Sequence, residues 1–220
     1  MYTSYLDLHT HQTLQPAGVQ RVFNVDVTAE SEELPGGWFS CGIHPWHAEL
    51  TYESNLTKLR ALAAMPEARL IGECGLDKLR GPAMKVQLQT LGMHVKLAED
   101  MGKPLIIHCV RAFSELLDMR KRLKINVPVI IHGFNKKPEL ARQLERQGFM
   151  LSVGSAACKP GSGAAAYAAA ATGPFFLETD DAGMGIDDVY AAVANLRKIS
   201  VEALKDRIFA NWKKFNLIDV

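Results

Sequence analysis

The chain has 220 residues, of which 48% are hydrophobic and 22% charged, and its formal net charge is +1. This composition is typical of a globular protein and excludes an intrinsically disordered chain, because enough apolar surface can be buried to offset the entropy of ordering. The near-zero charge excludes a strongly basic nucleic-acid coat and an acidic tail, but it leaves room for a local phosphate-binding cleft.

Three features bear on the cellular compartment. The first residues show no basic start followed by an apolar core, so we expect no signal peptide. No apolar stretch approaches ~20 residues, so we expect no membrane-spanning helix. Cys41, Cys74, Cys109 and Cys158 are far apart and form no CxxC pair, which favours reduced intracellular thiols over a disulfide framework. We therefore expect a cytoplasmic protein with no membrane partner. We also expect a monomer, although none of these three features bears on the oligomeric state.

Eight strand-like runs recur along the chain, and most end at a polar or ionisable residue. Several are short and continuously apolar, as expected for a parallel sheet that is covered on both faces. The predicted strands are residues 5–9, 21–27, 38–43, 69–72, 104–107, 128–131, 149–153 and 174–177.

Helical patterns lie between the later strands. An apolar stripe from Met84 to Ala98 steps by four, three, four and three residues, and Gly102 stands where this helix should end. The Ala-rich segment 163–171 predicts a surface helix of high intrinsic propensity. Ser200 is a helix start, with Glu202 in the first turn. Further helices are predicted over 54–64, 112–123 and 138–147, and along the stripes Val189, Val193, Leu196 and Val201, Leu204, Ile208, Trp212.

Alternating strands and helices predict an α/β fold, specifically a distorted TIM (β/α)8 barrel that forms a single domain over residues 1–220. Only residues 10–20 and 28–37 separate the first three strands, and these segments contain several Pro and Gly residues. We therefore expect the helices after strands one and two to be missing or shortened.

Candidate metal ligands stand at five of the predicted strand ends. In a parallel barrel these ends converge on the face where active sites form. Four imidazoles and two carboxylates suit zinc, manganese or iron, and His9 and His11 point the same way because they are two residues apart on an extended strand. A single histidine is more often structural than a metal ligand. Here, however, four histidines and two acidic residues would all have to be structural and stand at strand ends by chance, so a metal site is the better interpretation. The candidates are His9, His11, Glu73, His108, His132 and Asp180.

Six fragments, five of which contain these candidates, stand in a recognisable order: DLHTH (7–11), GIHP (42–45), IGECGLD (71–77), IIHCVRA (106–112), IIHGF (130–134) and LETD (177–180). Together they resemble the TatD family of metal-dependent deoxyribonucleases, which belongs to the amidohydrolase-like barrels. The match covers nearly the whole chain. It departs from the family pattern after the fifth strand, where Val110 stands in the usual Arg position and Arg111 follows one residue later.

The resemblance implies a two-metal site. His9 and His11 with Asp180 would hold one metal, His108 and His132 the other, and Glu73 would bridge them. Two cations about 3.5–4 Å apart can clamp the attacking and leaving oxygens and lower the pKa of a bound water. Asp180 would also act as the general base.

Other residues have two open interpretations each. Asp7 is either a carboxylate that orients an imidazole or a buried, hydrogen-bonded residue of the barrel floor. His44 contacts substrate or is structural, and Trp46 stacks on a base or packs over the side of the barrel that lacks helices. Lys136 and Lys137 reach phosphates or form a solvated helix start, and Arg111 is a further candidate for phosphate contact. Cys74 and Cys109 are predicted to be small buried residues.

The expected function is that of a divalent-metal-dependent hydrolase with one or two ions of zinc, manganese or magnesium. The resemblance implies DNA as substrate and removal of nucleotides from a 3′ end. One alternative is a small-molecule metallohydrolase such as an amidase, lactonase or phosphoesterase, because this barrel hosts many chemistries. Another is a non-catalytic binding protein stabilised by metal.

Overall fold

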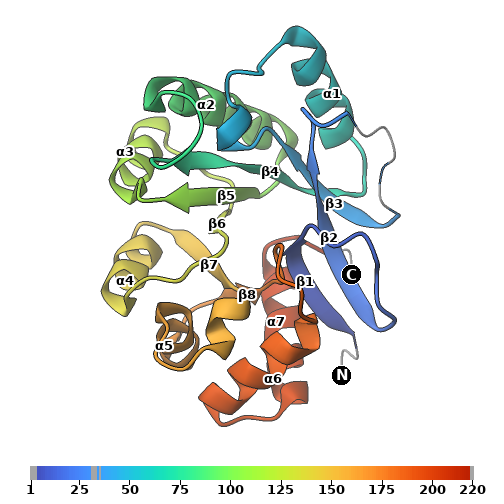
Figure 1. The fold of residues 1–220 in the computed structure, drawn as a ribbon, viewed down its shortest axis with the longest axis vertical. Helices are drawn as coiled ribbons and strands as arrows, with labels where there is room; N and C mark the ends of the chain where they lie inside the picture. The colour runs from blue at the N-terminus through green and yellow to red at the C-terminus, as the bar shows by residue number, and fades with distance from the viewer. Residues whose placement is uncertain (1–3, 31–33, 35, 219–220) are drawn as a thin grey trace. The chain divides into compact units, whose positions relative to one another are not determined.

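The computed structural model describes residues 4–30, 34 and 36–218 (Figure 1). These residues divide into two compact units. The first unit is formed by the described residues up to Phe23 together with those from Ile131 onward, and the second unit is Asn24–Ile130. The first unit is therefore built from the two ends of the chain, whereas the second is one continuous segment.

The strands and helices follow the predicted alternation. The strands are β1 (Tyr5–Thr10), β2 (Val19–Asp26), β3 (Trp38–Gly42), β4 (Ala68–Asp77), β5 (Leu105–Val110), β6 (Val129–Ile131), β7 (Phe149–Val153) and β8 (Phe175–Leu177). The α-helices are α1 (Glu53–Ala63), α2 (Met84–Met101), α3 (Phe113–Leu123), α4 (Pro138–Arg146), α5 (Gly163–Ala170), α6 (Ile186–Arg197) and α7 (Val201–Lys214). The 3-10 helices are η1 (Pro45–His47) and η2 (Ser155–Cys158).

The strands are ordered in the sheet as in the chain, from β1 to β8. The pairs β1–β2, β3–β4, β4–β5 and β7–β8 are parallel. Within the first unit, β1 also lies beside the end of β8, where Thr10 bridges Asp180. Among the described residues, no helix stands between β1 and β2 or between β2 and β3. This confirms the predicted shortage of helices after the first two strands.

The core of the first unit lies between its strands and the two C-terminal helices. Helices α6 and α7 pack against β1 and β8, and Trp212 and Phe176 are fully buried there. The hydroxyl of Tyr190 in α6 bonds both the amide and the carbonyl of Leu6 at 3.2 Å. Ser200 caps α7 as predicted, because its side chain accepts a hydrogen bond from the amide of Ala203.

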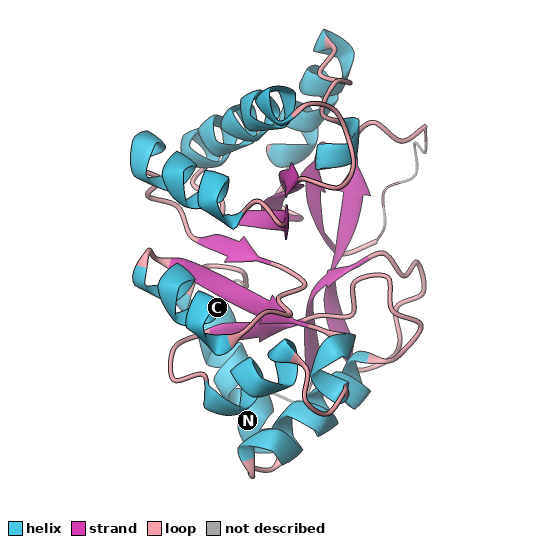
Figure 2. Ribbon diagram, turned by 60° about the vertical axis from the view of Figure 1, so that its left-hand side comes forward, coloured by secondary structure: helices cyan, strands magenta, loops and turns pink. Residues whose placement is uncertain are grey.

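The core of the second unit lies under the long helix α2, which packs on β4. The predicted stripe faces this core, with Leu91 and Ala98 buried. The helix ends at Gly102, which adopts the left-handed conformation that favours glycine at this position. Figure 2 shows the helices on the outside of the strands in each unit. No described helix is both long enough and apolar enough to cross a membrane.

Helix α5 is a surface helix as predicted, because Ala166, Ala169 and Ala170 are exposed. Its other face, with Ala164 and Ala168 fully buried, packs against α6 and η2. Two expectations are corrected. Strand β4 continues past residue 72 to Asp77, so Glu73 lies inside the strand. Cys74 is buried as predicted, but Cys109 is partly exposed.

Candidate metal centre

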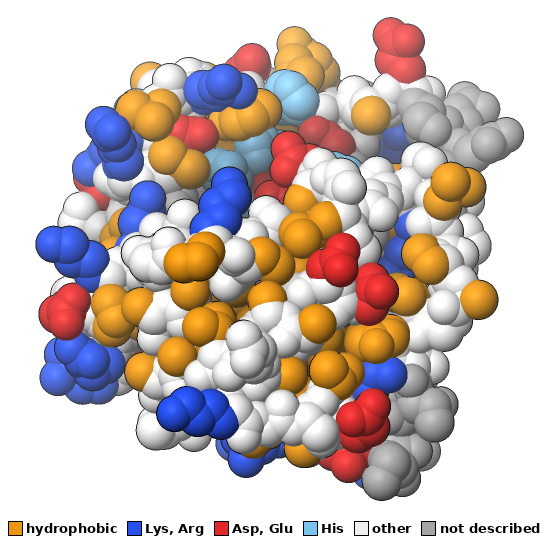
Figure 3. All heavy atoms as spheres, turned by 60° about the horizontal axis from the view of Figure 1, so that its bottom comes forward, with side chains coloured by type: hydrophobic (Ala, Val, Ile, Leu, Met, Phe, Trp, Pro, Cys, Tyr) orange, Lys and Arg blue, Asp and Glu red, His pale blue; other side chains and the backbone are white. Residues whose placement is uncertain are grey.

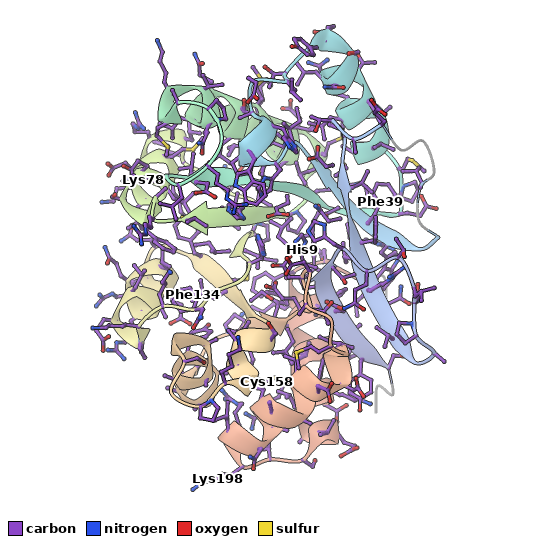
Figure 4. All side chains as sticks on the ribbon, in the orientation of Figure 1. His9, Phe39, Lys78, Phe134, Cys158 and Lys198 are labelled. Carbon is purple, nitrogen blue, oxygen red and sulfur yellow. The ribbon has the colours of Figure 1, made fainter. Side chains whose placement is uncertain are left out.

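In the first unit, His9, His11 and Asp180 form a group that we call the β1/β8 group. Their ligand atoms all lie within 4.8 Å of one another. The same oxygen, Oδ1 of Asp180, is 3.5 Å from Nε2 of His9 and 3.6 Å from Nε2 of His11. His9 is fully buried at the end of β1 (Figure 4), whereas the side chains of His11 and Asp180 are 43% and 36% exposed. The group therefore has one buried side and one side open to solvent.

The backbone around Asp180 explains how the two strand ends bring these side chains together. The amide of Asp180 donates to the carbonyl of His9 at 2.9 Å, and the amide of His11 donates to the carbonyl of Asp180 at 3.0 Å. Asp180 has a φ of 56°, the left-handed region that Asp tolerates better than most residues. The chain thus turns at the end of β8 while the carboxylate stays beside the imidazoles.

Asp7 is a buried, hydrogen-bonded residue of this unit, with 3% of its surface exposed. Its carboxylate accepts hydrogen bonds from the amide of Thr179 at 3.0 Å and from the hydroxyl of Thr179 at 2.7 Å. Burial raises the pKa of Asp7 to about 7, although both bonds from Thr179 oppose that rise. Asp7 thereby fixes the residue that immediately precedes Asp180, which favours the structural interpretation.

His132 follows β6 in the same unit, and its ring centroid lies 4.5 Å from that of His9. The neighbouring acidic residue is Glu178, for which the sequence pattern predicts no role. Glu178 is fully buried; its Oε1 accepts a hydrogen bond from the amide of Gly133 at 2.5 Å and lies 3.7 Å from Nδ1 of His132. A buried carboxylate beside an imidazole is a common support of a metal-ligating histidine.

The second unit holds another group, His44, Glu73 and His108, which we call the β3/β4/β5 group. Oε1 of Glu73 is 3.2 Å from Nε2 of His44 and 3.0 Å from Nδ1 of His108. The sequence predicts that His44 either contacts substrate or is structural, yet its ligand atom lies with those of two predicted metal ligands. The signal for this role was present, because the predicted strand before His44 ends on the same side as the others.

Two buried side chains that no sequence pattern marks as functional support the β3/β4/β5 group. Asn24 donates to Oε2 of Glu73 at 3.3 Å and accepts from the amide of Glu73 at 3.0 Å. Asp77 places Oδ2 at 3.3 Å from Nε2 of His108. Burial raises the pKa of Asp77, but hydrogen bonds from Trp46, Leu79 and His108 outweigh burial and hold it below its ordinary value. Asp77 therefore stays ionised and orients His108.

Both groups suit a divalent cation by their donor chemistry. Two donors bound to one tetrahedral cation at about 2.0–2.1 Å lie about 3.3 Å apart, close to the distances in the β1/β8 group. In the β3/β4/β5 group, a His108 that donates Nε2–H to Asp77 turns the lone pair of Nδ1 toward the Glu73 carboxylate. Two facing acceptors need a cation or a proton between them, so the residues fit a metal ion.

The predicted substrate residues lie on loops that follow the strands. Lys136 and Lys137 are exposed, and Lys137 is the residue before α4. Arg111 is exposed directly after β5, with a φ of 54°. Trp46 is 36% exposed and lies in η1. Figure 3 shows that histidine side chains reach the surface on one face of the molecule, beside acidic and hydrophobic side chains.

Comparisons with known proteins identify the family of the chain. Residues 8–216 match the family model described as TatD related DNase. The "3'-5' ssDNA/RNA exonuclease TatD" of Cronobacter turicensis is 29% identical over 132 residues, 59% of this chain and 50% of the relative. The "uncharacterized metal-dependent hydrolase YcfH" of Escherichia coli is 32% identical over 116 residues, 52% of this chain and 43% of the relative. The chain thus matches about half the length of these curated relatives.

Solved structures show the same fold over nearly the whole chain. The TatD homologue YjjV of Escherichia coli aligns with a TM-score of 0.79 and 24% identity, covering 98% of both chains. A TatD family hydrolase of Entamoeba histolytica aligns with a TM-score of 0.76 and 16% identity, again over 98% of both chains. The predicted TIM-barrel fold class is therefore confirmed. Because the family model matches from just before His9 to just past the end of α7, this chain belongs to the TatD-related DNases.

Proposed function

We propose that this protein is a divalent-metal-dependent hydrolase that cleaves phosphodiester bonds of DNA and removes nucleotides from a 3′ end. The observation that carries the proposal is the pair of groups that each combine histidines with a carboxylate, one in each unit. Imidazole and carboxylate are the ligands of hydrolytic metal sites. The names of the matched relatives, an exonuclease and a metal-dependent hydrolase, support the same reaction class.

The proposed ligands follow these groups. His9, His11 and Asp180 hold one cation, and Glu73 and His108 hold a second, with His44 beside them. The assignment of His132 to the second cation, and of Glu73 to both, comes from the family resemblance and is kept as part of the proposal. The metal is zinc, manganese or magnesium. Divalent cations supply charge that stabilises the oxygens of the reacting phosphate.

The side chains supply the rest of the chemistry. Asp180 has an exposed fraction of 36%, so its carboxylate can accept a proton from an attacking water as well as bind a cation. Lys136, Lys137 and Arg111 are exposed cations that bind the phosphates on either side of the scissile one. The cytoplasmic location and the monomeric state expected from the sequence remain predictions.

The metal part of the proposal is tested by elemental analysis. Purified wild-type protein supplied with zinc, manganese or magnesium should retain one or two ions per chain after removal of unbound metal. His9→Ala and Glu73→Ala should lower that number, whereas Ser200→Ala, which changes only the cap of α7, should leave it unchanged. A wild-type protein that retains no ion under any of these conditions would refute the metal centre.

The substrate is tested with 5′-labelled single-stranded and double-stranded DNA, each with and without a blocked 3′ end. Metal-dependent shortening that the block prevents is the expected result. Small phosphodiesters, amides and lactones are assayed in parallel. Metal-dependent turnover of an amide or lactone without any cleavage of DNA would replace the nuclease by a small-molecule metallohydrolase. Metal binding without turnover of any substrate would favour a binding protein.

A further inference from the structure

The indole of Trp46 lies beside the β3/β4/β5 group and remains 36% exposed. Its ring centroid is 4.6 Å from that of His44 and 6.1 Å from that of His108. Large aromatic side chains that pack a core are buried, as Trp212 is in this chain. Trp46 instead presents part of a flat apolar surface to solvent next to candidate metal ligands.

The position of Trp46 is tied to that of His108 through one carboxylate. Its Nε1–H donates to Oδ2 of Asp77 at 2.7 Å, and the same oxygen lies 3.3 Å from Nε2 of His108. Asp77 is only 3% exposed. Leaving a buried carboxylate without one of its hydrogen-bond donors destabilises the folded protein. Both rings are therefore held to Asp77, and this fixes the plane of the indole relative to the imidazole.

The loop that follows β4 adds a cation to this indole. The guanidinium carbon of Arg80 lies 4.6 Å from the centroid of the Trp46 ring. Oδ1 of Asp77 accepts hydrogen bonds from the amides of Leu79 and Arg80 at 2.7 and 3.2 Å. The carboxylate that holds Trp46 therefore also holds the backbone of the residue stacked on it.

Two further contacts hold this loop rigid. The side-chain amide of Gln87 in α2 donates to the carbonyls of Asp77, Arg80 and Pro82 at 2.9, 3.2 and 2.9 Å. Gly81 has a φ of 84°, and a Cβ at this residue would lie 2.6 Å from the carbonyl oxygen of Pro45. The loop thus lies directly against η1, so the pair of Trp46 and Arg80 is preformed.

We propose that Trp46 and Arg80 form a stacking platform for the nucleobase next to the scissile phosphate. The inference rests on the proposed phosphodiester hydrolysis. Indole and guanidinium planes both stack on bases, and a guanidinium also attracts the adjoining phosphate. The rigid platform lies beside His44 and His108, so a base stacked on it brings its own phosphate to the β3/β4/β5 group. The platform determines which substrates bind well and takes no part in the reaction itself.

The test compares substrates that differ only in the base. Wild type, Trp46→Ala and Arg80→Ala are assayed on a single-stranded oligonucleotide and on the same oligonucleotide with abasic 3′-terminal nucleotides. On the intact strand, Trp46→Ala should raise KM by about 5- to 150-fold, the range that base–aromatic stacking provides, with a smaller change in kcat. On the abasic strand, the variants and wild type should differ little. Equal losses on both substrates would overturn the proposal and make Trp46 a support of His108.

The chain offers a matched control, because Trp38 at the start of β3 carries Arg69 at 4.8 Å from its ring centroid. Trp38→Phe should leave the discrimination between intact and abasic strands unchanged. Binding is measured separately, with a phosphorothioate oligonucleotide and metal-free protein, by quenching of tryptophan fluorescence. Quenching should persist in Trp38→Phe and disappear in Trp46→Phe; quenching that persists in Trp46→Phe would refute the platform. If wild type cleaves neither strand, the proposed hydrolysis fails, whereas cleavage that ignores the base overturns only the platform.

Discussion

Asp7→Asn should stabilise the metal-free protein, and the gain in stability should grow with pH. Burial raises the pKa of Asp7 to about 7 from an ordinary value of 3.8. A carboxyl group with a higher pKa in the folded state than in the unfolded state binds its proton more tightly when folded. The contribution of Asp7 to the free energy of unfolding is therefore fully present below pH 3.8 and falls as pH rises toward 7. Above about pH 7 it no longer changes with pH.

The size of the effect follows from these two pKa values. Ionising Asp7 completely in the folded state lowers the free energy of unfolding by about 4 kcal/mol. At about pH 5 Asp7 is ionised in the unfolded chain but still protonated in the folded protein, and this difference already lowers the free energy of unfolding by roughly 1.5–2 kcal/mol. The wild-type chain should thus lose about 2.5 kcal/mol more between about pH 5 and pH 8, a large fraction of the 5–15 kcal/mol typical of a folded protein.

The assay is urea unfolding of wild type and Asp7→Asn at several pH values in the presence of a chelator. An Asn side chain still offers an oxygen to the Thr179 amide but carries no charge. Asp187→Asn is the matched control, because Asp187 is an exposed residue in the first turn of α6. Its pH profile should run parallel to that of wild type. A parallel profile for Asp7→Asn as well would refute the reasoning.

Three further changes have defined outcomes. Asp180→Asn should keep much of its bound metal, because His9 and His11 remain, but should lower kcat by ~10²–10⁴-fold at saturating metal, as measured by oligonucleotide cleavage. The double variant Lys136→Ala/Lys137→Ala should bind duplex DNA more weakly and flatten the log–log salt dependence by about one unit for each phosphate that the variant no longer binds, while it hydrolyses a small phosphodiester normally. Ser200→Ala should lower the free energy of unfolding by about 1 kcal/mol in a denaturant titration, since the amide of Ala203 no longer has its capping acceptor.

The order of strands and helices could be predicted because several strands are short apolar runs and most helices repeat their apolar residues at helical spacing. The end of α2 could be placed from Gly102 alone, since glycine readily takes the left-handed conformation that stops a helix. The predicted end of β4 was wrong, because Glu73 was interpreted as the first residue after the strand, whereas the strand continues to Asp77. Polar residues inside a strand look like its end when the partners that bury them, such as Asn24, lie far away in the sequence.

The buried face of helix α5 could not be predicted from the sequence. Alanines have high helix propensity on any surface, and one large side chain, Tyr167, does not make an apolar stripe that marks a face. Only the packing of α6 and η2 against it shows that Ala164 and Ala168 are inside. The supporting carboxylates Asp77 and Glu178 were missed for a related reason. Their role depends on the imidazole that lies beside each of them, and no spacing in the sequence records that proximity.

The discontinuous first unit has a consequence for the nascent chain. At a synthesis rate of about 5–20 residues per second, the ribosome needs about 5–20 s to make residues 24–130, which follow the first strand in the chain. During that time Leu6 and Leu8 of β1, which are buried in the finished protein, lack α6 and α7 to cover them. The bonds between Leu6 and the Tyr190 hydroxyl join residues 184 positions apart, so they form only after α6 has been synthesised. The N-terminal strand is therefore the segment that most needs a chaperone, and the second unit, which is continuous in the chain, is the part that can fold first.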